Sequence, residues 1–104
     1  MKKPITDKVE VSVDFPDKAY YGSFDHRSTF GVRADDQGIH IDLERRGGER
    51  RHVGFHVHYY LLADLFESIG KALSDQKVMD EAHADALRES AQSLAEAVKT
   101  LRTD

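Results

Sequence analysis

The apolar residues of this chain change their spacing near residue 59. Before that point, apolar and polar residues alternate in short runs, as in Val-Glu-Val-Ser-Val at 9–13. After it, apolar residues recur every three or four positions. The first spacing is typical of half-buried β-strands and the second of amphipathic helices. The sequence therefore predicts an α+β fold in which strands precede helices.

Four strands are expected, at about 8–15, 27–34, 39–44 and 51–58. The segment between the first two, residues 16–27, is interpreted as a loop because Pro16 cannot donate a hydrogen bond to a sheet. If Asp36 and Gln37 form the next turn, Phe30 lies opposite Leu43 and every inward residue meets another. These strands predict a four-stranded antiparallel meander.

The turn at Gly47 and Gly48 cannot be a two-residue loop. Such a loop would place the apolar residues of the last strand opposite the polar residues of 39–44. A loop of three or five residues, or a bulge, restores the match. The register expected is therefore Ile41 opposite Val53 and Ile39 opposite Phe55.

Two helices are expected after the sheet, at about 59–74 and 76–101. The first carries an apolar stripe, and we expect it to pack on the apolar face of the sheet. With 104 residues, the chain has the usual length of one domain, so 1–104 is taken as a single domain.

Composition narrows the class of protein. The net charge is −4 and cysteine is absent, which excludes disulfides and thiolate metal sites and is compatible with the cytoplasm. No apolar run approaches the roughly 20 residues that a membrane-spanning helix needs. No nucleophile motif or phosphate loop is present. A cytoplasmic protein without enzymatic activity or a cofactor is therefore expected.

Histidines on the polar sheet face suggest metal binding as an alternative function. Alternation places His52, His56 and His58 on one face of the last strand, with His40 and Asp42 on the strand beside it. Imidazole and carboxylate groups are zinc ligands. A zinc site drawn from these five residues is therefore a second hypothesis.

An arginine-rich turn offers a third hypothesis. Basic residues surround the two glycines, at Arg45, Arg46, Arg50 and Arg51. The order of strands and helix is similar to that of some single-strand nucleic-acid binders, which stack bases on aromatic side chains. The outward sheet positions hold no aromatic residue, and the net charge is negative, so binding of nucleic acid is disfavoured.

Apolar residues outside the sheet suggest an interface with another protein. The last helix has a stripe at helical spacing that includes Leu87, Ala91, Leu94, Val98 and Leu101. The loop before the second strand holds three aromatic residues, Tyr20, Tyr21 and Phe24. The leading hypothesis is a protein-interaction domain that forms a homodimer, binds another protein, or does both.

Overall fold

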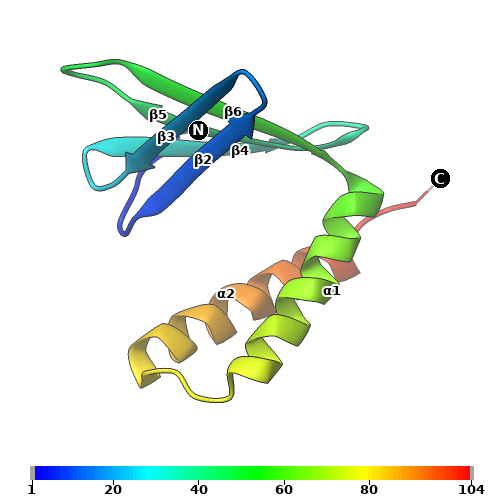
Figure 1. Ribbon diagram of the computed structural model, residues 1–104. Helices are drawn as coiled ribbons and strands as arrows, with labels where there is room; N and C mark the ends of the chain where they lie inside the picture. Colours follow the sequence, from blue (N-terminus) through cyan, green and yellow to red (C-terminus); the bar gives the residue numbers. More distant parts are fainter. Residues whose placement is uncertain (1, 104) are drawn as a thin grey trace. The chain divides into compact units, whose positions relative to one another are not determined.

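The computed structural model describes residues 2–103 and confirms the α+β class. A four-stranded antiparallel sheet is followed by two helices (Figure 1). The elements in chain order are β1 Lys2–Pro4, β2 Val9–Phe15, β3 Lys18–Phe24, β4 Ser28–Ala34, β5 Gly38–Arg45, β6 Arg51–His58, α1 Tyr59–Gln76 and α2 Glu81–Lys99. Two compact units, residues 1–66 and 67–104, are described separately below as the strand unit and the helical unit.

The membership of the sheet differs from the sequence prediction. Its order is β1-β4-β5-β6, whereas β2 pairs with β3 in a separate two-stranded sheet. The expected loop at 16–27 is thus mostly strand β3. Phe15 lies opposite Lys18, so Pro16 and Asp17 form a tight turn rather than ending the sheet. Proline suits such a turn because its φ angle is already fixed near the required value.

The registers test the two turn predictions. Phe30 lies opposite Leu43 across β4 and β5, as predicted. The predicted register of β5 with β6 is wrong by two residues, since Ile41 lies opposite Phe55. The loop is the five-residue one, because Arg45 pairs with Arg51. A shift of two residues keeps every side chain on its predicted face.

The core of the strand unit is small and lies beneath the β2–β3 hairpin. That hairpin crosses one face of the larger sheet (Figure 1). Ile5, Phe24 and Leu43 are buried there, and partly buried Val, Phe and Val side chains at positions 9, 30 and 53 pack against them. The same sheet face is open farther along, where Val32 is 51% exposed and Phe55 is 44% exposed.

Helix α1 follows β6 without a break, and its first residue contacts the sheet. The Tyr59 N–H donates to the Gln37 carbonyl at 3.3 Å, and the Tyr59 hydroxyl donates to the Asp35 carbonyl at 2.6 Å. No residue of α1 is buried.

The boundary between the helices also differs from the prediction. Helix α1 ends at Gln76, and Lys77 adopts a left-handed φ of 65°. A left-handed residue just after a helix is a common way to end it. Helix α2 begins at Glu81, capped by the Asp80 carboxylate, which accepts from the His83 N–H. No helix formed by residues 2–103 has the length and apolar character required to span a membrane.

Candidate functional site

Histidines meet across the polar face of the sheet. His40 on β5 lies directly opposite His56 on β6. Their rings are stacked, with centroids 3.8 Å apart and planes inclined by 10°. His58 lies next along β6, and its ring is tilted by 54° against that of His56 at 4.7 Å. Two strands therefore bring three imidazoles together.

Asp35 joins this group from the turn between β4 and β5. Its Oδ2 lies 2.6 Å from Nε2 of His40, and its Oδ1 lies 3.6 Å from Nε2 of His56. Ligand atoms of the three residues all lie within 4.8 Å of one another. Asp35 was not among the predicted ligands, because a turn accounts fully for an aspartate at that position. The signal that could have indicated it is its position five residues before His40, on the other side of the same turn.

The turn holds the Asp35 carboxylate in place. Oδ1 accepts hydrogen bonds from the N–H groups of Gln37 at 2.8 Å and Gly38 at 2.9 Å. The hydrogen bond with His40, and next these two backbone bonds, hold the pKa of Asp35 well below its usual value. The carboxylate is therefore charged and oriented toward the imidazoles.

A close backbone approach places β6 beside this turn. A Cβ atom added at Gly38 would lie 2.2 Å from the Val57 carbonyl oxygen. Real Cβ atoms do not approach backbone that closely, so this position requires glycine. The exchange of one hydrogen atom for a methyl group would push the His56 strand away from Asp35.

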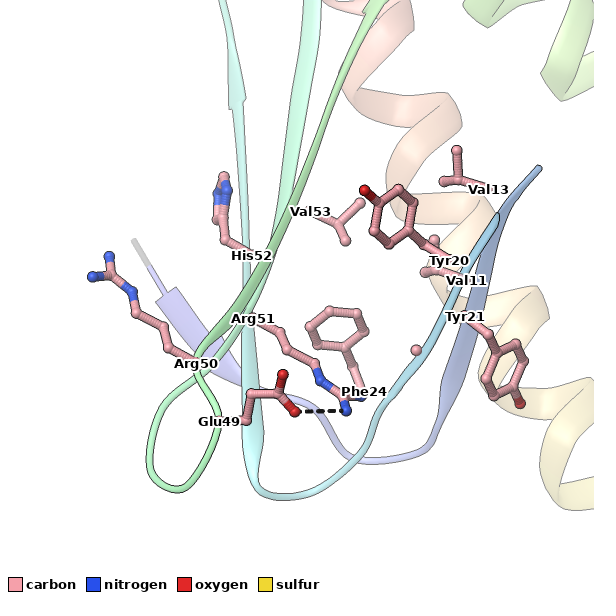
Figure 2. Close-up of a pocket in the computed structure, with 11 residues that line it drawn as sticks. Val11, Val13, Tyr20, Tyr21, Phe24, Glu49, Arg50, Arg51, His52 and Val53 are labelled. Atoms are coloured by element: carbon pink, nitrogen blue, oxygen red, sulfur yellow. Dashed lines mark hydrogen bonds and ion pairs between the residues drawn. The ribbon is translucent and has the colours of Figure 1, made fainter. Parts of the chain in front are cut away.

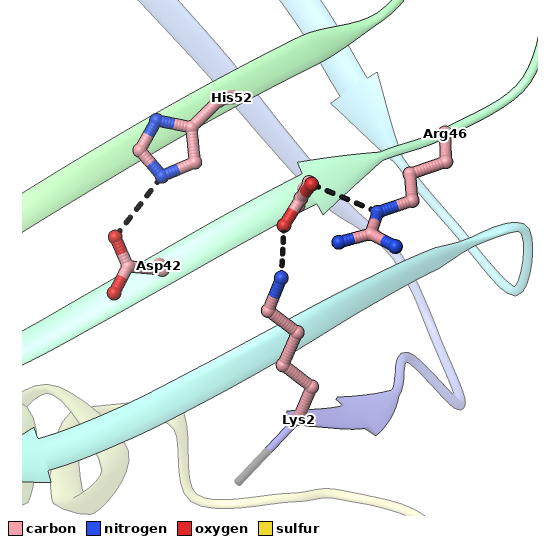
Figure 3. Close-up of polar contacts among 5 residues, drawn as sticks. Lys2, Asp42, Arg46 and His52 are labelled. Atoms are coloured by element: carbon pink, nitrogen blue, oxygen red, sulfur yellow. Dashed lines mark hydrogen bonds and ion pairs between the residues drawn. The ribbon is translucent and has the colours of Figure 1, made fainter.

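The five residues predicted as metal ligands share one sheet face but form two groups. Asp42 lies opposite Gly54 rather than His52, because the register differs by two residues. The Asp42 Oδ1 nevertheless reaches Nε2 of His52 diagonally at 3.1 Å (Figure 3). This pair is separate from the group formed by Asp35, His40 and His56.

Glu44 forms two ion pairs at the base of the arginine-rich turn. Lys2 on β1 and Arg46 both point at its carboxylate, at 2.5 and 3.0 Å (Figure 3). These two hydrogen bonds, with Lys2 the larger cause, lower the pKa of Glu44 to about 2. Arg51 similarly pairs with Glu49 at 3.4 Å. Two of the four predicted phosphate-binding arginines are thus already paired with neighbouring carboxylates.

The aromatic residues and the arginine-rich turn share one hollow. Figure 2 shows Tyr20 on β3 and Arg51 on β6 across from each other, and the hollow measures about 480 Å³. Phe24, in contrast, is a core residue with 1% exposure. Tyr21 is 68% exposed, and its hydroxyl donates to Glu10. Only the two tyrosines of the predicted aromatic group are therefore available to a partner.

The predicted interface on α2 is also exposed. Four large members of the stripe have substantial accessible surface: Leu87 at 46%, Leu94 at 45%, Val98 at 52% and Leu101 at 69%. Leu101 lies just beyond the helix, which ends at Lys99.

Comparison of the chain with protein-family models, with curated proteins and with solved structures gave no match.

Proposed function

We propose that this protein is an interaction domain without enzymatic activity that forms a homodimer through its helical unit. The observation that carries the proposal is the exposure of both helices. Neither α1 nor α2 has a buried residue, although each carries an apolar stripe. Ile69 of α1 and Val98 of α2 are each more than half exposed. Exposed apolar stripes of this kind favour association, because removal of apolar surface from water is favourable.

The size of the helical unit supports the need for a partner. Between 67 and 103, the helical unit consists of the last part of α1, the connection and α2 with the few residues after it. Units below about 40 residues seldom fold without disulfides, metals or oligomerisation. Cysteine is absent from the chain, so a disulfide cannot supply the missing stability.

The pattern of the α2 stripe favours a second copy of this chain as the partner. Its six positions are separated by three, four, three, four and three residues: Ala84, Leu87, Ala91, Leu94, Val98 and Leu101. This series is the same in both directions. Two antiparallel copies therefore align these positions, with Ala91 facing Leu94 within the helices and Ala84 facing Leu101 just beyond the helix end of the second copy.

Side-chain size and charge agree with that antiparallel arrangement. Ala91 of one copy faces Leu94 of the other, so small and large residues alternate across the seam. Glu81 at the start of α2 comes near Arg102, which follows the helix end of the second copy, and this gives an attractive pair at each end. A parallel pair would instead bring like charges together.

A hollow between the helices gives the second copy a place to enter. Within the helical unit, Leu73 of α1 and Leu87 of α2 line a cavity of about 390 Å³. Two helical hairpins joined through α2 would close a four-helix core over it. Closed two-fold symmetry is the commonest form of homo-oligomer. A cytoplasmic location, with which a cysteine-free chain is compatible, is part of this proposal.

Light scattering after size-exclusion chromatography tests the homodimer. We expect the wild-type chain to have twice its 11.8 kDa mass, and Leu94→Glu to have the single mass because it places two charges in the central layer. Gln92→Glu adds the same charge to the same helix outside the stripe and should remain dimeric. A wild-type chain that is monomeric at high micromolar concentration overturns the proposal.

Disulfide cross-linking tests the antiparallel register, since the chain has no native cysteine. Ala91→Cys and Leu94→Cys chains are mixed in equal amounts and oxidised. The antiparallel seam predicts that the mixed dimer forms faster than either homodimer. Preferential cross-linking of Leu94→Cys to itself would indicate a parallel seam and contradict the proposed arrangement.

A further inference from the structure

We propose that Asp35, His40 and His56 bind one divalent cation of the zinc class on the polar face of the sheet. This site is independent of the proposed dimer, because all three residues belong to the strand unit. Two imidazoles and one carboxylate form a ligand set that suits Zn²⁺. Zinc sites with three protein ligands leave a further position for water.

The distances in the cluster suit a small ion. In a tetrahedral zinc site with bonds of about 2.0–2.1 Å, ligand atoms lie roughly 3.4 Å apart. Nε2 of His56 and Oδ1 of Asp35 are 3.6 Å apart, close to that value. Nε2 of His40 and Oδ2 of Asp35 are closer, at 2.6 Å, because they share a proton in a hydrogen bond. The ion takes the place of this proton: a neutral His40 binds the ion through Nε2 and carries its one proton on Nδ1. The Nε2 and Oδ2 atoms then move apart slightly.

The carboxylate is oriented before any ion binds. Backbone N–H groups of Gln37 and Gly38 hold Oδ1, and the Tyr59 hydroxyl holds the Asp35 carbonyl. Outer contacts of this kind commonly fix the direction of metal ligands. The turn is therefore anchored on one side by its own backbone and on the other by the first residue of α1.

The site is partly shielded from solvent. The His40 side chain is 20% exposed, and those of His56 and Asp35 are 31% and 32% exposed. Partial burial reduces competition from water, while the remaining opening leaves a path for the ion. The ring of His58 packs against that of His56. The three residues whose ligand atoms lie within 4.8 Å of one another are Asp35, His40 and His56, so His58 is not proposed as a ligand.

One positive charge works against the cation. Arg33 on β4 lies opposite His40, on the same face of the sheet. The bound ion would add two positive charges near the single negative charge of Asp35. Removal of the guanidinium by Arg33→Gln should therefore strengthen binding, an effect that a purely structural histidine stack would not produce.

Calorimetric titration of the metal-free, untagged full chain with Zn²⁺ tests this site. We expect one ion per chain. Asp35→Asn and His56→Gln should each weaken binding by at least about tenfold, the loss that removal of even an outer-shell partner can cause. His52→Gln is the matched control, because it removes an imidazole from the same strand and face. It should leave the affinity unchanged.

Two further measurements distinguish binding at this site from binding elsewhere and from an effect of the dimer. In proton NMR spectra, the ring signals of His40 and His56 should shift on addition of Zn²⁺, whereas those of His52 should not. The Leu94→Glu chain should bind Zn²⁺ as the wild type does, whatever its mass. Absence of binding, or a loss of affinity in His52→Gln or His58→Gln as large as in Asp35→Asn, overturns the proposal. Circular dichroism of each variant verifies that its fold is retained.

Discussion

The strand unit and the helical unit place their apolar side chains differently. The strand unit buries Phe24, Ile5 and Leu43 under the β2–β3 hairpin and so has a core of its own. The helical unit buries none of its helical residues. A sheet can cover part of its apolar face by folding a hairpin over it. Two helices alone have no third element for this purpose. Association should therefore matter mainly for the helical unit.

The largest effect should come from loss of the strand-unit core. Phe24 is 1% exposed, so Phe24→Ala should lower the free energy of unfolding by about 3–5 kcal/mol. Chemical denaturation followed by circular dichroism measures this change. Tyr20→Ala, at a position 60% exposed on the same strand, should cost at most about 0.5 kcal/mol. Equal losses in the two variants would mean that the hairpin does not form the core.

An intermediate and pH-dependent effect should come from Glu44. Its pKa is about 2 in the folded protein, below its ordinary value of 4.5, because Lys2 and Arg46 stabilise the charged form. The carboxylate therefore stabilises the fold fully above about pH 4.5, and this stabilisation is lost as pH falls toward 2.

Denaturation of wild type and Glu44→Gln across this pH range tests the linkage. The variant should be less stable than the wild type at pH 7, and the difference should shrink toward zero near pH 2. Asp14→Asn is a suitable control, because Asp14 lies on β2 opposite Ala19, whereas Lys2 and Arg46 pair with Glu44. A difference between wild type and Glu44→Gln that stays constant with pH would contradict the ion-pair explanation.

Alanine in place of a glycine should have opposite effects on stability in the two units, and the effect in the helical unit should be the smallest of those considered. A Cβ atom added at Gly70 in α1 would meet no atom within 4 Å, so Gly70→Ala should stabilise the helix by about 0.5–1 kcal/mol. Gly38→Ala, in the strand unit, should destabilise because its methyl group would overlap the Val57 carbonyl. Thermal unfolding measures both changes. If Gly70→Ala also destabilises, another surface must cover that side of α1.

Short strands limited the prediction of the sheet. The runs at 27–34, 39–44 and 51–58 alternate cleanly, and all three are strands of the sheet. The three-residue strand β1 is too short to show a period, so its pairing with β4 could not be predicted. Strand β3 was missed because Pro16 was interpreted as the end of the sheet at that point, and the consecutive tyrosines of β3 also break the alternation. The registers show the same limit, since a pattern of period two fixes a face but leaves shifts of two residues open.

The change from strands to helices and the division of the sheet into apolar and polar faces could be predicted from the sequence, because both depend on local spacing along the chain. The same pattern also placed His40 and His56 on the same face. That these two histidines are direct neighbours follows from the folded chain and not from the pattern, because the length of the loop at 46–50 sets which residues meet. The inclusion of Asp35 was likewise a tertiary result, because side-chain distances across a turn depend on how the flanking strands close around it.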